Sequence, residues 1–173
     1  MQNKQYLKLR DQVSEMNKIH DEISLINWNK EDGPKFSSVE EMKEFENSLN
    51  NNELDYLFGD EENANIIDSK DIIIESFTHK KDDMEFIIYT YQKNIDSDYM
   101  TYLSLTNIKD NDTIDKLCGR SNSNKDNAHH YFETLKTEIM TNTIDEILES
   151  LIIGAQKTII GLNNTLSKLT SES

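Results

Sequence analysis

The sequence contains little cysteine, proline or glycine, and each shortage excludes a class of structure. Its 173 residues include one cysteine, one proline and five glycines. A single cysteine, Cys118, excludes a disulfide within the chain and a zinc site made of several cysteines, and it agrees with a reducing compartment. Because proline and glycine most often interrupt helices, their scarcity predicts long helices.

Long apolar runs are also missing. The best candidate, residues 143–169, is interrupted by Glu149, Gln156 and Lys157, so it lacks the run of roughly 20 apolar residues that a membrane span needs. The first residues, MQNKQYLKLRDQV, show neither the apolar segment nor the cleavage pattern of a signal peptide. The sequence therefore predicts a cytoplasmic protein with no membrane partner.

The short motifs of common enzymes and cofactor sites do not occur. There is no GxSxG, GxGxxG or GxxxxGK[ST] pattern, and the four histidines lack metal-binding spacings such as HExxH. His129 and His130 are adjacent, so on a helix they point about 100° apart and do not share one metal. Nothing near Cys118 favours an activated thiolate. We therefore predict a protein that is not an enzyme and has no cofactor and no metal; an enzyme would need one of these three residues beside a carboxylate.

Basic residues are also scarce relative to acidic ones. The chain has 18 lysines and arginines against 33 aspartates and glutamates, a formal net charge of -15. This balance argues against direct nucleic-acid binding, because phosphate contacts need clustered cations. The excess is also concentrated, since residues 36–70 carry ten acids and two bases, a net of -8. More than half of the excess charge therefore lies in about a fifth of the chain.

This acidic stretch is the predicted partner-binding surface. Concentrated carboxylates attract a basic protein partner by electrostatic steering. The alternative is an ordinary solvated face that binds nothing. The predicted partner-binding residues are Glu40, Glu41, Glu44, Glu53, Asp55, Asp60, Glu61 and Glu62.

The most regular stretch of the chain is Thr143–Leu169, in which IIGAQKT is followed by IIGLNNT. Its apolar residues recur at alternating steps of four and three, which places them along one line of a helix. Thr143 and Glu146 fit a capping box at the start of this helix. The line, which we call the C-terminal seam, consists of Leu148, Ile152, Ala155, Ile159, Leu162, Leu166 and Leu169.

The repeat also places Gly154 and Gly161 on the side of the helix opposite the seam. Each glycine costs a helix about 1 kcal/mol relative to alanine, so we expect another element to approach this side closely and Ile153 and Ile160 to be buried against the sheet or the acidic helix. The alternative is a surface helix that tolerates both glycines.

Two further helices are predicted in the first part of the chain. Apolar residues between Gln5 and Trp28 recur at helical spacing and form a second seam. This seam is expected to pack on the C-terminal seam, or both seams meet copies of themselves in a homodimer. A short helix is expected after Ser38, which forms a capping box with Glu41.

The middle of the chain predicts a β-meander. Three runs are rich in Ile, Tyr, Phe and Thr and are joined by short loops, which favours antiparallel hairpins. The runs are Asp71–Thr78, Met84–Gln92 and Tyr99–Asn107. One face of the sheet is expected to be covered by helices. Tyrosines on the other face are expected to form cross-strand or core pairs, with an interaction surface as the alternative; they are Tyr89, Tyr91, Tyr99 and Tyr102.

The segment after the meander is predicted to be irregular. Asp110–Leu117 is expected to form a helical turn, and Gly119–Lys125, which has no apolar residue, a mobile loop. An alternative for this loop is a basic contact tip made by Lys116, Arg120 and Lys125. A helix is expected to resume from about Asn127.

Together these patterns predict a single α+β domain over residues 1–173. It has N-terminal helices, a three-stranded antiparallel meander, and long C-terminal helices that pack with the first helix. The predicted segments are a helix over 1–30, an acidic helical region over 36–58, the β-meander over 71–107 and the C-terminal helices over 127–169.

The leading functional hypothesis is a non-enzymatic, acidic binding protein. It would act as a stoichiometric inhibitor of a basic protein, as an immunity, antitoxin-like or anti-defence protein does, with carboxylates placed where a nucleic acid would present phosphates. The alternatives are an assembly or secretion chaperone that holds a client along a helix or sheet edge, and a coiled-coil component of a larger structure.

Overall fold

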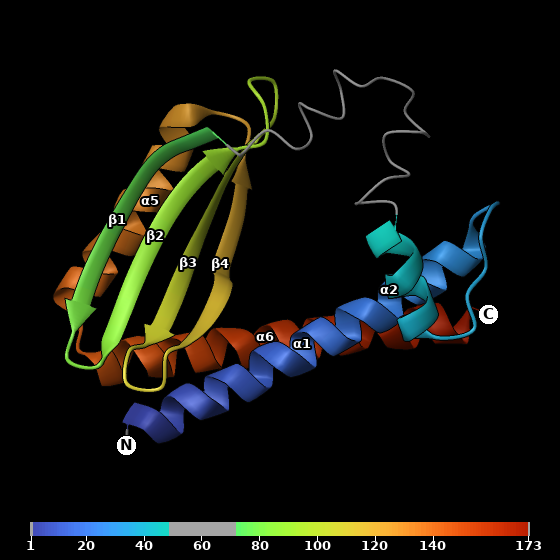
Figure 1. Ribbon diagram of the computed structural model, residues 1–173, viewed down its shortest axis with the longest axis horizontal. Helices are drawn as coiled ribbons and strands as arrows, with labels where there is room; N and C mark the ends of the chain where they lie inside the picture. The colour runs from blue at the N-terminus through green and yellow to red at the C-terminus, as the bar shows by residue number, and fades with distance from the viewer. Residues whose placement is uncertain (1, 49–71, 173) are drawn as a thin grey trace. The chain divides into compact units, whose positions relative to one another are not determined.

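The computed structural model describes residues 2–48 and 72–172 (Figure 1). These residues form an α+β fold of N-terminal helices, an antiparallel sheet, and C-terminal helices that pack with the first helix, as the sequence predicts. The elements are α1 (Gln2–Lys30), α2 (Val39–Ser48), β1 (Ile72–Lys81), β2 (Met84–Gln92), β3 (Tyr99–Asn107), β4 (Asp112–Asn122), α5 (Lys125–Thr141) and α6 (Ile144–Ser171).

The chain divides into two compact units, each described by itself. Unit 1 comprises Met1–Arg10 and Ser69–Ile152, and unit 2 comprises Asp11–Asp68 and Ile153–Ser173. The division falls inside α1 and inside α6, so each of these helices contributes residues to both units. The single domain over 1–173 stays a prediction.

Unit 1 is built on a sheet of order β1-β2-β3-β4 in which every neighbouring pair is antiparallel. The three predicted strands are confirmed, and the register of the central pair places Phe86 opposite Leu105 and Ile88 opposite Leu103. These four residues are buried on the face that α5 covers. Figure 1 shows α5 lying along one face of the sheet and leaving the other face without a helix of this unit.

The prediction for residues 110–125 is wrong, because Asp112–Asn122 forms a fourth strand, β4. The predicted helical turn at Asp110–Leu117 and most of the predicted loop at Gly119–Lys125 therefore belong to the sheet. Register shifts separate the pairs that β4 makes with β3, and Lys116 and Cys118 adopt positive φ angles of 58° and 52°. Such bulges interrupt the alternation of apolar and polar residues from which a strand is recognised.

An apolar stripe of α5 forms the other side of the unit 1 core. Its members are spaced by four, three and four residues, which aligns them on one side of a helix. They are Ala128, Phe132, Leu135 and Ile139, and all are buried. The first turns of α1 close the core at the sheet end, where the buried Tyr6 hydroxyl donates to the Asp112 carboxylate and backbone carbonyl at 2.8 Å. The backbone turn that begins β4 is therefore tied to α1.

Unit 2 contains the rest of α1, α2 and the rest of α6. Ile19 of α1 and Met42 of α2 are buried. The ends of the two long helices are linked by an ion pair of 3.6 Å between Lys30 and Glu172. The part of the C-terminal seam in unit 2 begins with the buried Ala155 and continues with four half-buried residues, so the seam is the covered side of α6 here.

Both predicted capping residues act at helix starts. The Thr143 amide donates to Glu146 at 3.0 Å, and the Glu146 amide donates to the Thr143 hydroxyl at 3.2 Å, so this capping box is confirmed. At α2 the Glu41 amide donates to the Ser38 hydroxyl at 3.2 Å. The Glu41 carboxylate, however, accepts from the amide and hydroxyl of Ser37, one residue earlier than a capping box requires.

The predicted close approach to the glycines of α6 is wrong. Within residues 2–48 and 72–172, a methyl group built on Gly154 or Gly161 meets no atom within 4 Å beyond the adjacent residues and the backbone of α6 itself, and the side chains of Ile153 and Ile160 are 45% and 62% exposed. The alternative interpretation, a surface helix that tolerates both glycines, fits these positions. In each repeat the threonine four residues later donates to the glycine carbonyl, at 3.0 and 3.1 Å.

The open glycine side gives a stability prediction. We expect Gly154→Ala and Gly161→Ala each to raise the free energy of unfolding by about 0.5–1 kcal/mol, because alanine restricts the unfolded chain and finds room in the helix. Urea unfolding followed by circular dichroism measures this change. Loss of stability in either variant would instead indicate an element packed closely against that side.

Candidate functional site

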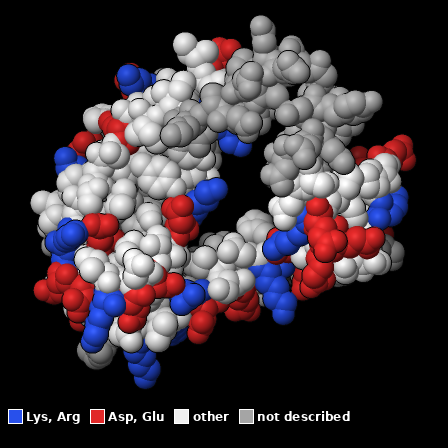
Figure 2. Space-filling model, viewed as in Figure 1, with Lys and Arg blue, Asp and Glu red and all other residues white. Residues whose placement is uncertain are grey.

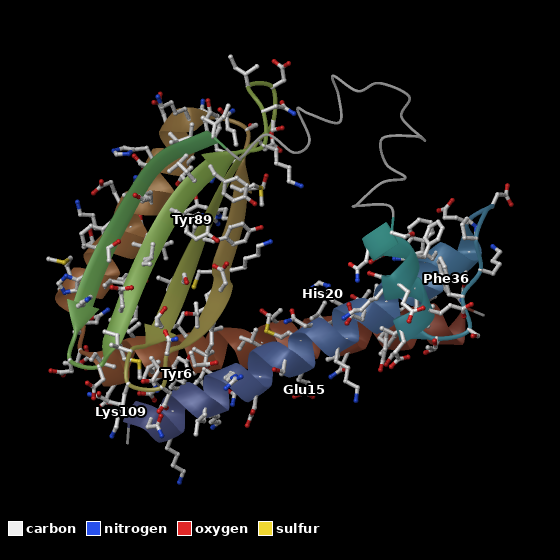
Figure 3. The ribbon with its side chains drawn as sticks, viewed as in Figure 1. Tyr6, Glu15, His20, Phe36, Tyr89 and Lys109 are labelled. Carbon is white, nitrogen blue, oxygen red and sulfur yellow. The ribbon has the colours of Figure 1, made fainter. Side chains whose placement is uncertain are left out.

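Helix α2 carries the described part of the predicted acidic surface and is held by an aromatic cluster in unit 2. The cluster consists of Trp28, Phe36 and Phe45, whose ring centroids lie 5.3 to 5.9 Å apart. Met42, the next apolar position on the helix, is only 1% exposed. Figure 3 marks Phe36 in the segment between α1 and α2. The apolar side of α2 is therefore fixed, and its other side faces outward.

Hydrogen bonds hold the turn between α1 and α2. The Phe36 amide donates to Asn29 Oδ1 at 2.8 Å, and Asn29 Nδ2 donates to the Phe36 carbonyl at 3.0 Å. On α2 itself, Glu46 accepts from the Trp28 indole at 3.0 Å, and Lys43 lies 2.7 Å from the carboxylate of Asp21 in α1. These contacts engage Glu46, one of the acidic residues of α2, and Lys43, its only basic residue.

Three of the predicted partner-binding residues lie on the outward side of α2. Glu40, Glu41 and Glu44 are all exposed, and Figure 2 shows acidic side chains gathered over this helix. Hydrogen bonds from the Ser37 hydroxyl and amide lower the pKa of Glu41. Glu40 and Glu44 make no hydrogen bond or ion pair with any residue of the described ranges 2–48 and 72–172. The other predicted partner-binding residues lie outside the described residues: Glu53, Asp55, Asp60, Glu61 and Glu62.

The Asn29 contacts give a test of how α2 is held. We expect Asn29→Ala to lower the free energy of unfolding by about 1–3 kcal/mol, because two net hydrogen bonds of about 0.5–1.5 kcal/mol each are lost. Trp28 is the only tryptophan in the chain, so its fluorescence during urea unfolding reports on this cluster.

The matched control is Asn27→Ala. Asn27 is exposed on α1 two residues earlier and makes none of these contacts. An equal loss of stability in both variants would show that the Phe36 contact does not hold the turn.

The open face of the unit 1 sheet carries a tyrosine cluster. Tyr89, Tyr91 and Tyr102 have ring centroids 6.0 Å apart in each pair, and Tyr89 is paired directly with Tyr102 across β2 and β3. Figure 3 shows Tyr89 on the sheet face away from α5. Tyr99 is three residues from Tyr102 on the same strand, so it belongs to the opposite face. The expected cross-strand pairing is therefore confirmed for three of the four tyrosines.

Strand β4 borders this cluster with polar and small residues. The Tyr89 hydroxyl donates to Asp115 Oδ1 at 2.9 Å, and burial together with this hydrogen bond raises the pKa of Tyr89. The Lys116 ammonium lies 5.9 Å from the centroid of the Tyr102 ring. A methyl group on Gly119 would lie 2.5 Å from Cε1 of Tyr102. The ring therefore rests directly on the glycine backbone, which only glycine permits.

This contact predicts the effect of filling the glycine position. We expect Gly119→Ala to destabilise the protein by about 1–3 kcal/mol, as is typical when a packed site is overfilled. In a Tyr102→Ala background the same change is expected to cost far less, because the obstructing ring is gone. A double-mutant cycle by urea unfolding measures the coupling. Equal costs in the two backgrounds would contradict the contact.

The predicted basic contact tip is not a single patch. Lys116 lies over Tyr102 on the open face of the sheet. Arg120 pairs with Thr101 and lies 4.8 Å from the ring centroid of Tyr131 on α5, on the covered face. Lys125 begins α5. The bulges in β4 turn successive side chains to different faces, which residue spacing alone does not reveal.

The histidines and the cysteine are distributed among separate contacts. His129 binds the Glu75 carboxylate at 2.9 Å, and His79 stacks on Phe77 at 6.0 Å between ring centroids. Although part of Cys118 is exposed, desolvation by neighbouring atoms and the charge of Glu138 raise its thiol pKa to about 11. Within the described part of the chain, no group of three or more His, Cys, Asp or Glu side chains is arranged to hold a metal ion.

Among the described residues, no helix combines the length and apolarity that crossing a membrane requires. Comparison of the chain with protein families, curated proteins and solved structures gives no match.

Proposed function

We propose that the protein is a non-enzymatic acidic binding protein of the cytoplasm that associates stoichiometrically with a basic protein partner through α2. Its effect on the partner is inhibition, of the immunity, antitoxin-like or anti-defence kind. The observation that supports this proposal is the pair Glu40 and Glu44, exposed and without a described partner on a helix whose opposite side is fixed by the aromatic cluster.

The spacing of the two carboxylates is unfavourable for the helix, although Glu40 also lies in the first turn, where the helix dipole stabilises an acid. Residues four apart on a helix are neighbours, and two like charges at that spacing destabilise it by about 0.2–0.5 kcal/mol. The nearest base, Lys43, is engaged by Asp21 and so relieves this repulsion only in part. A partner that supplies lysine or arginine side chains converts the repulsion into attraction.

The fixed helix also favours binding. Holding carboxylates on a rigid scaffold lowers the entropy that association costs. Arginine forks match a carboxylate as they match a phosphate. A partner that normally binds nucleic acid therefore presents suitable groups to α2.

The proposal predicts a charge-specific loss of binding. Capture of partners from the native host, followed by quantitative mass spectrometry, is expected to recover a basic protein. Affinity for that protein is expected to fall about 2- to 30-fold in the Glu40→Gln/Glu44→Gln variant, since exposed ion pairs contribute about 0.2–1 kcal/mol each. Binding is also expected to weaken from about 0.1 M to about 1 M salt, where the screening length falls from about 10 Å to about 3 Å.

The control is Glu15→Gln/Glu149→Gln, which removes the same charge from exposed positions of α1 and α6. It is expected to bind as the unmodified chain does. Binding that resists salt, or that both double variants weaken equally, would exclude a specific role for α2.

The second candidate is an assembly or secretion chaperone, and the open face of the sheet favours it. Tyr89 and Tyr102 are half-buried there, and the exposed Ile73 of β1 is paired with Tyr91 on the same face. A client held on this apolar and aromatic surface would bind with weak salt dependence, which distinguishes it from the first candidate. A homodimer through the helical seams is the third, and a monomer by light scattering would exclude it.

A further inference from the structure

A pocket of about 400 Å³ opens between the end of β4 and the first half of α5, in unit 1. It is distinct from α2 and from the tyrosine cluster. Its size is within the range of small-molecule sites. Its lining residues are Arg120, Asn122, Asn127, His130, Tyr131 and Thr134.

The lining comes from two regular elements. Arg120 and Asn122 are alternate residues of β4, so both side chains lie on the sheet face that α5 covers. The α5 residues follow spacings of three, one and three, which is one side of a helix. Because β4 is an edge strand, the pocket opens at the side of the sheet.

The pocket is rich in hydrogen-bond donors. The Asn122 Nδ2 group is buried and has no hydrogen-bond partner among residues 2–48 and 72–172. A buried donor without a partner costs about 1–3 kcal/mol. Less than 1 Å² of this atom is accessible, so a ligand in the pocket accepts from it, and removes that cost, only if the Asn122 side chain turns toward it. The Arg120 guanidinium carries only donors, and the Asn127 amide and His130 ring add further polar groups to the lining.

Two neighbouring hydroxyls fix the walls. The Tyr131 hydroxyl donates to the Cys118 carbonyl at 2.6 Å, and the Thr134 hydroxyl donates to the His130 carbonyl at 2.9 Å. The Arg120 guanidinium lies over the Tyr131 ring, with 4.8 Å from Cζ to the centroid. The Tyr131 ring therefore packs against one face of the Arg120 guanidinium. The bulge at Cys118, with its positive φ, places the carbonyl that holds the ring.

The charge of the pocket lining is opposite in sign to the net charge of the chain. None of the lining residues is a carboxylate, although the formal net charge of the chain is -15. Of the α5 residues in the lining, only Asn127 lies in the first turn, where the helix dipole favours an anion, and its backbone amide already donates to the Asn124 cap. We propose that this pocket binds the phosphate group of a small molecule. Donors approaching from a strand and from a helix suit a tetrahedral group better than a planar carboxylate.

The test uses the full chain and defined probes. Inorganic phosphate, phenyl phosphate and acetate are titrated at constant ionic strength, and the side-chain amide of Asn122 is followed by nuclear magnetic resonance. We expect saturable binding of a phosphate probe with a dissociation constant on the order of 1 mM or below, and weaker binding of acetate. Tighter binding of phenyl phosphate indicates an ester ligand, and equal binding indicates free phosphate; both support the site.

Variants locate the binding. Arg120→Gln is expected to weaken phosphate binding about tenfold or more, since charge-assisted hydrogen bonds are lost. Asn122→Ala, which removes the unpartnered amide, is expected to weaken phosphate binding several-fold. It provides a second test if Arg120→Gln perturbs the fold. Lys125→Gln removes a nearby cation outside the lining and is expected to change little. Absence of saturation, unchanged binding in both lining variants, or acetate binding as tight as phosphate overturns the proposal.

Discussion

Burial of the α5 stripe against the sheet is the interaction on which unit 1 depends. Phe132 and Leu135 of α5 are buried, as are Phe86 and Leu105 on the sheet face that α5 covers, and burial of each such side chain is worth about 1.5–3 kcal/mol. This packing decides which face of the sheet stays open for the tyrosines. It also decides where the pocket forms, because the lining positions of α5 mostly precede a buried one: 127 before 128, 131 before 132, and 134 before 135.

The local patterns of the sequence predicted much of this fold. Helical spacing found α1 and α6, the Thr143 capping box marked the start of α6, and β-rich runs found three strands. The fourth strand was missed because Lys116 and Cys118 break its alternation, and that break depends on pairing with β3. The glycine side of α6 was misjudged because periodicity gives the direction of a side chain but not what lies opposite it.

The sequence predicts the acidic surface of α2 better than the pocket, because the pocket depends on contacts between distant parts of the chain. Glu40, Glu41 and Glu44 are visible as an acidic run, and α2 does present them outward. Their different roles were not visible, because the bond between Glu41 and Ser37 depends on the geometry of the turn. The sequence does not predict the pocket, because its patterns place Arg120 and Asn122 in a loop. Only the fourth strand brings these two residues beside Asn127 and Tyr131 on α5.

Both edges of the sheet are irregular, and this bears on self-association. β4 contains two residues in the left-handed region, and β1 has a shift in register between Ile73 and Glu75 and ends in Lys80 and Lys81. An incoming strand needs a continuous row of free amides and carbonyls, which bulges and lysines deny. The sheet is thereby a poor template for aggregation, and a client would have to bind the tyrosine face by its side chains, not extend the ladder.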